Sequence, residues 1–437
     1  MAVLEPQDTA AALSAQPSAA APVAAPAAKP AALSATPSST PSAAFAALVL
    51  AMLMGLQPIT TDLMLPALPA MAADLHAGMA PVQLTMSALI LAFGLAQLVW
   101  GPVADRIGRR PVLLMGLALY TAASLGAALA GQVATVVAWR ALQGAAMSAA
   151  VVCARAMVRD LYAPHQGAMV MARALTGLGI VAVASPLVAG LLVSGWGWRA
   201  AVLAMGVVGA GVLLFIALRL PETAPAHRVE SSTFRPVWRQ MGRIVRNPTF
   251  RAWAVLVGCS YGGIYIFLAG SGFVLIKVLG LAPTQAGAVM CTCSLAYIAG
   301  TLLCRRWIPN VGLAGAVARA SWLTAAAAAG LVLLAILDTR SVLAVMLPVW
   351  LYALGHGVHN PCGQAGSVGP FPHAAGMASA LAGFMLGVVA FGIGLWLGHA
   401  LDGTVRPFAA AMATAAMLTV LVARTLVQRH GERVMAV

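Results

Sequence analysis

The chain has 437 residues, of which 61% are hydrophobic and only 8% are charged, and its mean hydropathy is +0.92. These values exclude an ordinary soluble protein of this length and indicate a chain that crosses a lipid bilayer many times. The formal net charge of +14 does not indicate nucleic-acid binding, because the basic residues fall almost entirely in short gaps between apolar runs.

The first 43 residues consist almost entirely of Ala, Pro, Ser and Thr. This composition has too few large apolar side chains to offset the entropy lost on ordering, so it predicts a disordered tail. Glu5 and Asp8 stand where a signal peptide has basic residues. We therefore do not expect a signal peptide here.

From Phe45 onward the sequence contains about twelve apolar runs of the length, about 20 residues, that a membrane-spanning helix requires. This number predicts an all-α membrane protein with twelve transmembrane helices. The runs cover roughly residues 44–68, 81–101, 111–131, 133–156, 168–193, 198–218, 252–276, 284–304, 313–337, 341–361, 374–399 and 404–425.

Basic residues concentrate at one end of these runs. The gap at residues 101–111 carries three Arg and one Asp, and 20 of the 25 Lys and Arg residues lie on the same side as this gap. Arg and Lys concentrate in cytoplasmic loops, so this pattern predicts that both termini are cytoplasmic. We expect a multi-pass protein of the bacterial inner membrane.

The longest polar connection is a basic linker at residues 219–251. It divides the chain into two bundles of six helices, residues 44–218 and 252–425, and leaves 426–437 as a short cytoplasmic tail. Two six-helix halves joined by a cytoplasmic linker are typical of transporters whose halves rock around a substrate near the middle of the bilayer. The two halves are expected to be pseudo-symmetric.

Several short motifs occur in an order and spacing that resemble one family. Residues 61–69 resemble a first-helix signature and residues 101–111 the loop between helices two and three. Residues 140–144 and 185–190 resemble motifs of helices four and five, and weaker matches follow in the second half. On these motifs the chain resembles the major facilitator superfamily, and within it the drug:proton antiporters of the Bcr/CflA (bicyclomycin and chloramphenicol resistance) type.

Asp62 is the sharpest candidate for chemistry, because a carboxyl group within an apolar run is costly unless it is protonated, paired or in contact with water. Removal from water favours the neutral carboxyl group, so Asp62 is suited to take up and release a proton near neutral pH. We expect proton and substrate to compete for it. The alternative is a structural hydrogen bond near a helix end that Pro66 and Pro69 interrupt.

Arg140 is the natural partner of Asp62. Its guanidinium is always charged, so within the fourth run it must face a carboxylate, carbonyl groups or a water-filled cavity. The family resemblance implies a role in proton coupling. The alternative is that its side chain extends to the membrane surface, since the run begins only a few residues earlier.

The charged turn has a second expected role besides topology. Asp105 and Arg109 are spaced to pair on one helical face, and Gly residues in the turn allow close backbone approach. The resemblance implies that Asp105 also contacts a helix N-terminus in the opposite half and holds the cytoplasmic side closed. The alternative is a turn needed only for insertion. The predicted latch consists of Gly101, Asp105, Arg106, Gly108, Arg109 and Arg110.

The fifth run contains the residues that resemble an antiporter motif. Pro186 removes one backbone hydrogen bond, and small residues around it permit close helix contact. The motif residues are Gly177, Gly179, Ser185, Pro186 and Gly190.

The second half offers walls for a substrate cavity. Tyr261 and Tyr265 are one helical turn apart and, with Phe267, are expected to form one aromatic face for planar, lipophilic ligands. The remaining cavity candidates are Gln57, Tyr297, His356, His359 and Asn360. The two histidines are expected to pack or line the cavity and not to bind a metal, because no acidic or Cys partner follows at ligand spacing.

Motifs for other chemistry are missing from the sequence. With only Lys29 and Lys277 as lysines, it has no GxxxxGK[ST] phosphate loop, and it has no HExxH motif. We therefore expect neither an enzyme nor a cofactor. The sequence predicts a monomeric efflux transporter that exchanges protons for phenicol-like or bicyclomycin-like drugs. The alternatives are a proton-coupled exporter or symporter of a metabolite, such as a sugar, organic acid or amino acid, and a non-transporting receptor or channel.

Overall fold

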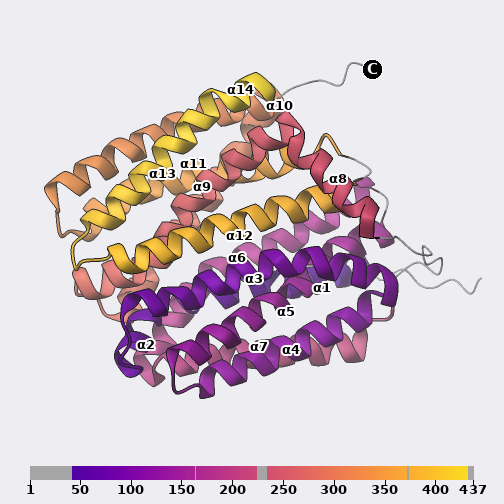
Figure 1. Cartoon of the computed structure of the whole chain (residues 1–437), viewed down its shortest axis with the longest axis horizontal. Coiled ribbons are helices and arrows are strands. Elements are labelled where there is room, and N and C mark those ends of the chain that lie inside the picture. Colours follow the sequence, from indigo (N-terminus) through magenta and orange to yellow (C-terminus); the bar gives the residue numbers. More distant parts are fainter. Residues whose placement is uncertain (1–41, 163, 224–233, 372–373, 432–437) are drawn as a thin grey trace, which may run out of the picture. The chain divides into compact units, whose positions relative to one another are not determined.

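The computed structural model describes residues 42–162, 164–223, 234–371 and 374–431. Nearly all of these residues are helical, and the helices follow the predicted apolar runs (Figure 1). The predicted disordered tail falls almost wholly on residues 1–41, which lie outside the described residues, as do residues 432–437 of the predicted C-terminal tail.

The helices of the first half are α1 (Ala43–Asp62), α2 (Leu68–Asp74), α3 (Met79–Ile107), α4 (Arg109–Leu129), α5 (Val133–Leu161), α6 (Pro164–Trp196) and α7 (Trp198–Arg219). Those of the second half are α9 (Pro248–Gly272), its π-helical continuation η1 (Phe273–Val278), α10 (Pro283–Leu337), α11 (Val342–Val368), α12 (Ala375–Ala400), α13 (Arg406–Arg424) and α14 (Leu426–His430). Helix α8 (Phe234–Arg246) lies between the halves in the sequence.

Eleven helices in the described part of the chain are long and apolar enough to cross a membrane. The difference from twelve predicted runs arises in α10, which has 55 residues and would be roughly 80 Å long if straight, against a hydrocarbon core of about 30 Å. Gly312 breaks it with non-helical backbone angles (φ 66°, ψ −176°). The eighth and ninth runs are therefore two spans joined at a kink, and the twelve-helix fold is confirmed.

Short helices occur where no helix was predicted. Helix α8 lies within the predicted linker, and α9 begins at Pro248, four residues before the predicted run. Helix α2 follows a turn at residues 63–67, where Pro66 interrupts the first predicted run. These segments are too short or too polar to stand out in a search for membrane spans.

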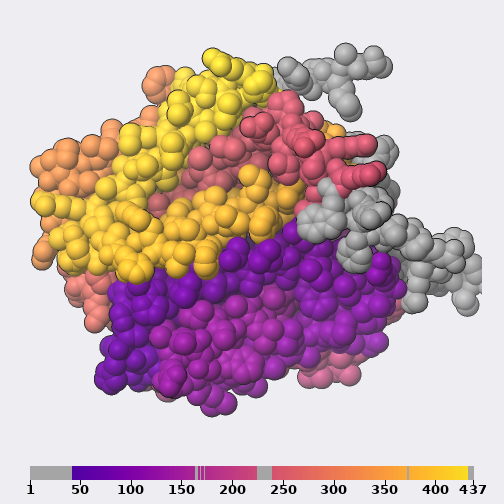
Figure 2. All heavy atoms as spheres, viewed as in Figure 1, coloured from indigo at the N-terminus to yellow at the C-terminus, as the bar shows by residue number. Residues whose placement is uncertain are grey.

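The helices of each half pack mainly on one another. In the first half α3 and α4 pack on α5, α4 packs on α7, and α1 packs on α6, whereas in the second half α9 and α10 pack on α11 and α13. The most extensive contacts between the halves are those of α3 with α12 and of α6 with α10. Figure 2 shows the boundary along which the orange and yellow residues of the second half meet the indigo and magenta residues of the first.

Small residues let the two halves approach closely along α3 and α12. A Cβ atom on Gly387 would lie 3.0 Å from the Ile90 carbonyl oxygen, and one on Gly398 would lie 2.5 Å from Cα of Ala80. Backbone contact of this kind requires glycine in the α12 helix, as is common where membrane helices pack tightly. The contact positions the site at the junction of the halves.

Candidate functional site

Asp62 lies at the C-terminal end of α1, and only 9% of the residue is exposed. The Thr61 hydroxyl donates a hydrogen bond of 2.8 Å to its Oδ1. Asp62 is also close enough to interact electrostatically with Tyr261 of α9 and Cys293 of α10. The carboxyl group therefore faces the junction with the second half, and no basic side chain forms an ion pair with it among the described residues.

Arg140 is fully buried in α5 and is held by neutral groups. Its Nη atoms donate to Gln143 Oε1 at 2.6 Å and to the Thr60 carbonyl oxygen at 2.9 Å, and they contact the sulfur atoms of Met86 and Met205 at 3.4 Å each. Its Nε has no hydrogen-bond partner in the described residues. The predicted pairing with Asp62 is wrong for this conformation, because the guanidinium bonds to Gln143 and Thr60 instead. The alternative of an extension to the membrane surface is also wrong, because the side chain is 0% exposed.

The groups around Arg140 form a hydrogen-bond network that was not predicted from the sequence. Gln143 Nε2 donates to Ser124 Oγ at 2.6 Å, and the hydroxyls of Thr60 and Tyr120 are 2.6 Å apart. Thr60 is only two residues from Asp62, so Arg140 fixes the α1 backbone beside the carboxyl group. The sequence feature that could have predicted this network is Gln143, a polar residue within the apolar run one helical turn after Arg140.

Two hydrogen bonds connect the halves close to this network. Tyr265 Oη of α9 lies 3.1 Å from Ser87 Oγ of α3, and Gln83 Nε2 donates to the Ala269 carbonyl oxygen at 2.5 Å. Ser87 and Gln83 were not predicted, although both are polar residues within an apolar run. These bonds hold α3 against α9 in the present conformation.

The predicted aromatic face is partly present. The rings of Tyr261 and Tyr265 are stacked with centroids 6.3 Å apart, and Tyr261 is half-buried. Phe267 is buried and forms no ring contact with either tyrosine in the part of the chain that the structure describes. The prediction is wrong for Phe267, because a spacing of two residues turns its side chain to another side of the helix.

The polar residues of α10 and α11 separate into two groups. Asn360 Nδ2 donates to Tyr297 Oη at 3.3 Å, and the rings of Tyr297 and His356 have centroids 5.5 Å apart. His356 Nδ1 lies 2.8 Å from Ser260 Oγ of α9, whereas His359 Nε2 lies 3.0 Å from Thr324 Oγ1 of α10.

The two histidines therefore bond in different directions, and no group of three potential metal ligands occurs among the described residues. Gln57 is half-buried, like Tyr297 and Asn360, and His356 and His359 are buried. Tyr297, His356 and Asn360 lie together, while His359 lies apart.

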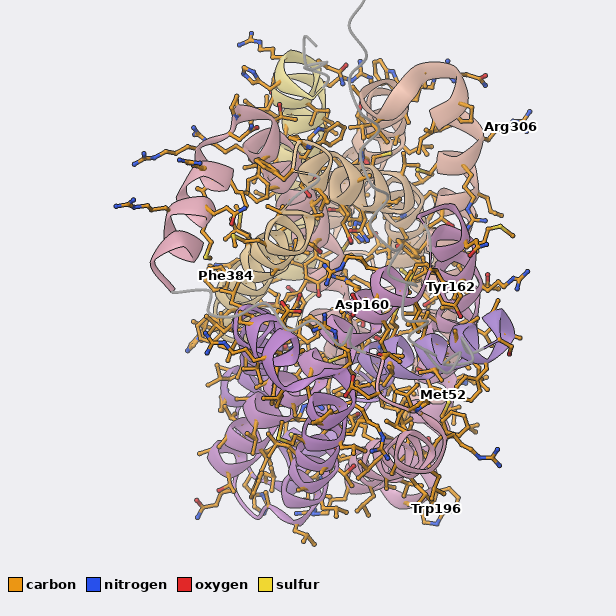
Figure 3. The ribbon with its side chains drawn as sticks, turned by 90° about the vertical axis from the view of Figure 1, so that its right-hand side faces the viewer. Met52, Asp160, Tyr162, Trp196, Arg306 and Phe384 are labelled. Carbon is orange, nitrogen blue, oxygen red and sulfur yellow. The ribbon has the colours of Figure 1, made fainter. Side chains whose placement is uncertain are left out.

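The charged turn forms a compact cluster at the arginine-rich end of the helices. The Arg109 guanidinium bonds to Asp105 Oδ1 at 2.6 Å and to Asp160 Oδ2 of α5 at 2.9 Å. Figure 3 looks onto this end and labels Asp160 near the middle of the view. Asp160 and Glu222 were not predicted as members of this cluster, although both are acidic residues beside predicted spans.

The geometry of this turn differs from the prediction in one respect. Gly108 has φ +99° and ends α3, so Asp105 and Arg109 pair across a turn and not along one helix. The Glu222 carboxylate accepts from the backbone N–H groups of Arg109 at 2.9 Å and Arg110 at 3.2 Å and so caps α4. Asp105 is 62% exposed at its side chain and forms no hydrogen bond or ion pair with the second half among the described residues.

A surface hollow of about 560 Å³ lies beside this turn and is lined by Arg110, Pro111 and residues 217–222. Its lining includes none of the predicted cavity residues. We therefore do not assign the substrate site to this hollow. Gly101 and Arg106, the remaining residues of the predicted latch, lie on the last turns of α3.

The predicted antiporter motif forms the contact between α6 and α10. Pro186 cannot donate to the Ala182 carbonyl oxygen, and the Ser294 hydroxyl of α10 donates to that oxygen at 3.3 Å. A Cβ atom on Gly190 would lie 2.6 Å from the Pro283 carbonyl oxygen. The motif thus joins the halves at their backbones.

The remaining motif residues differ in their surroundings. A Cβ atom on Gly177 would lie 2.9 Å from Cβ of Ala51 in α1, so close packing is found there. Gly179 would meet nothing within 4 Å, and the predicted tight contact is wrong at this position. The Ser185 hydroxyl donates to the Val181 carbonyl oxygen of its own helix at 2.7 Å.

Comparisons with known proteins agree with this architecture. The family model described as Major Facilitator Superfamily matches residues 43–395. Multidrug resistance protein D of Escherichia coli (strain K12) is 31% identical over 341 residues, covering 77% of this chain and 84% of that protein. The Chloramphenicol resistance protein of Pseudomonas aeruginosa is 31% identical over 336 residues, covering 76% and 78%.

A solved structure supports the fold alone. The D-xylose-proton symporter superposes with a TM-score of 0.73 at 15% identity, over 90% of this chain and 100% of that chain.

Proposed function

The chain belongs to the Major Facilitator Superfamily, and from this membership and the position of Asp62 we propose that it exports amphipathic drugs in exchange for protons by alternating access. Two relatives named for multidrug and chloramphenicol resistance support a drug as the cargo and favour it over a metabolite. The proposed setting is the bacterial inner membrane, with the arginine-rich end of the helices and both termini in the cytoplasm.

The observation that carries the proposal is a buried carboxyl group at the junction of the halves that has no basic partner among the residues the structure describes. A carboxylate in this position is costly unless its charge is balanced. A proton balances the charge, and so does a cationic or hydrogen-bonding drug. Because one group cannot hold both at once, drug binding displaces the proton, and proton uptake releases the drug.

Arg140 acts in this proposal as a positioning residue. Its bond to the Thr60 carbonyl oxygen fixes the end of α1, two residues before Asp62. Removing the guanidinium leaves buried acceptors without a donor, which costs about 1–3 kcal/mol for each such group. Arg140 therefore holds the geometry in which Asp62 exchanges its proton.

Contacts that form and break between the halves supply the alternating movement. The bonds of Tyr265 with Ser87 and of Gln83 with Ala269 close the end of the site away from the arginine-rich turn. The Arg109 cluster lies within the first half, and in the opposite conformation its exposed Asp105 contacts the second half and serves as the latch. The protein works as a monomer, because one chain supplies both halves.

The test compares wild type with Asp62→Asn in a pump-deficient bacterium and in proteoliposomes. We expect Asp62→Asn to abolish chloramphenicol resistance and drug-driven proton release, because the amide cannot take up a proton. Asp402→Asn is the matched control, since Asp402 is an exposed acid outside the membrane-spanning helices. Equal resistance and proton release in wild type and Asp62→Asn would remove Asp62 from the mechanism.

A further inference from the structure

Helix α8 is a short amphipathic helix that has no role in the proposed transport mechanism. Its sequence, FRPVWRQMGRIVR, contains four Arg and no acidic residue. Arg239, Arg243 and Arg246 are spaced by four and three residues, so they share one face of the helix. All three are exposed, and none forms an ion pair or hydrogen bond in the described part of the chain.

The opposite face of α8 is apolar and packs partly on the protein. Ile244 is 1% exposed and clusters with Phe250 of α9 and with Ala378 and Leu381 of α12. Val245 is 44% exposed and remains outside this cluster. The helix is thus attached to the second half through Ile244 and still presents apolar surface beside its cationic face.

The chain places α8 at the membrane surface. Arg246 ends α8, and only Asn247 separates it from Pro248, where the membrane-spanning α9 begins. With 13 residues, α8 is about 20 Å long, which is too short to cross the hydrocarbon core. A polar helix with one strongly basic face and one apolar face lies in the plane of the membrane interface.

From these observations we propose that α8 is a binding site for anionic phospholipid headgroups of the leaflet in which α9 begins. The guanidinium groups of Arg239, Arg243 and Arg246 bind the phosphates, and the apolar side chains beside them contact the upper acyl region. Arg pairs with phosphate through two parallel hydrogen bonds, which suits it to this ligand. The site does not depend on which drug is transported or on the role of Asp62.

The charge of the helix favours a lipid over another acidic partner. Basic residues immediately beside a membrane helix meet a leaflet that already concentrates negative charge within a Debye length. Each arginine near such a surface strengthens binding about fivefold, so three together contribute on the order of 100-fold. A soluble partner has no comparable local concentration.

The experiment measures lipid adducts on the full-length protein in detergent by native mass spectrometry. Phosphatidylglycerol and phosphatidylcholine with the same acyl chains are titrated separately. We expect wild type to bind phosphatidylglycerol more tightly and to lose this preference in 1 M salt. The triple variant Arg239→Gln/Arg243→Gln/Arg246→Gln is expected to lose the preference of wild type for phosphatidylglycerol over phosphatidylcholine.

A second triple variant, Arg305→Gln/Arg306→Gln/Arg319→Gln, is the matched control. These three arginines are also exposed, they carry the same charge, and Figure 3 shows Arg306 projecting outward at the edge of the molecule. We expect this variant to keep the phosphatidylglycerol preference of wild type. An equal loss in both variants would show that total charge decides binding and would overturn the site on α8.

Replacing the same three α8 residues with lysine tests folding and charge together. The lysine variant keeps the charge and is expected to keep most of the lipid preference, whereas the glutamine variant loses it. Wild type without any preference for phosphatidylglycerol over phosphatidylcholine would overturn the proposal even if the glutamine variant failed to fold. Binding of a short RNA in place of lipid would assign the face to nucleic acid and likewise overturn it.

Discussion

Removing the hydrogen bond between Tyr265 and Ser87 tests most directly how the two halves are held together. Tyr265→Phe removes the phenol oxygen but keeps the ring stacked on Tyr261. The Ser87 hydroxyl still has the Gln83 carbonyl oxygen at 3.2 Å, so the variant leaves no orphaned donor. The loss is therefore close to the net value of one hydrogen bond, about 0.5–1.5 kcal/mol.

This magnitude predicts a shift of conformational populations. If the bond exists only while the end away from the arginine-rich turn is closed, its removal changes the ratio of closed to open molecules by roughly two- to thirteenfold. Ser87→Ala is expected to have a larger effect, because it leaves the buried Tyr265 hydroxyl without its partner. The double variant is expected to resemble Tyr265→Phe, because without the Tyr265 hydroxyl the Ser87 replacement removes no further bond between the halves.

Single-molecule fluorescence measures the populations directly. Dyes are attached at Gln132→Cys and Arg340→Cys, two exposed positions in different halves at this end, in a background without the native cysteines. Closed molecules give high energy transfer, and we expect the fraction of low transfer to rise in Tyr265→Phe. Fully additive effects of the two single variants would refute a shared bond across the junction.

Two further predictions concern packing and pH. Gly190→Ala should lower the free energy of unfolding by about 1–3 kcal/mol, because the added Cβ would lie 2.6 Å from the Pro283 carbonyl oxygen. The control Gly179→Ala should have the unfolding temperature of wild type, because a Cβ there meets nothing within 4 Å. Similar unfolding temperatures for the two variants in thermal scans would contradict the α6–α10 contact. Hydrogen bonds from the Trp198 indole and the Arg199 guanidinium lower the pKa of Asp74 below its ordinary value of 3.8. Ionised Asp74 therefore stabilises the folded protein above pH 3.8, and this contribution is lost as the pH falls through the lowered pKa. Wild type and Asp74→Asn should then differ in unfolding temperature at neutral pH and have the same unfolding temperature below the lowered pKa. A difference that persists at that low pH would contradict the pairing of Asp74 with Trp198 and Arg199.

Local sequence signals predicted the fold because membrane spans depend on the chain segment itself. A run of about 20 apolar residues must form a helix in lipid, whatever it packs against, since every backbone N–H and C=O group needs a partner. The kink at Gly312 and the helix α8 were not predicted. Both lie in polar segments that the sequence placed correctly between apolar runs, but the backbone conformation of such a segment depends on the helices around it.

The candidate site was predicted only in part, because the sequence identifies costly residues but not their partners. The sequence alone determined that Asp62 and Arg140 lie inside apolar runs and need compensation. Only the tertiary structure decided that Arg140 bonds to Thr60 and Gln143 and leaves Asp62 at the junction of the halves. The physical reason is that burial follows from local hydropathy, whereas a hydrogen bond requires two groups within about 3 Å, and residues from helices far apart in the chain reach that distance only through the packing of the whole bundle.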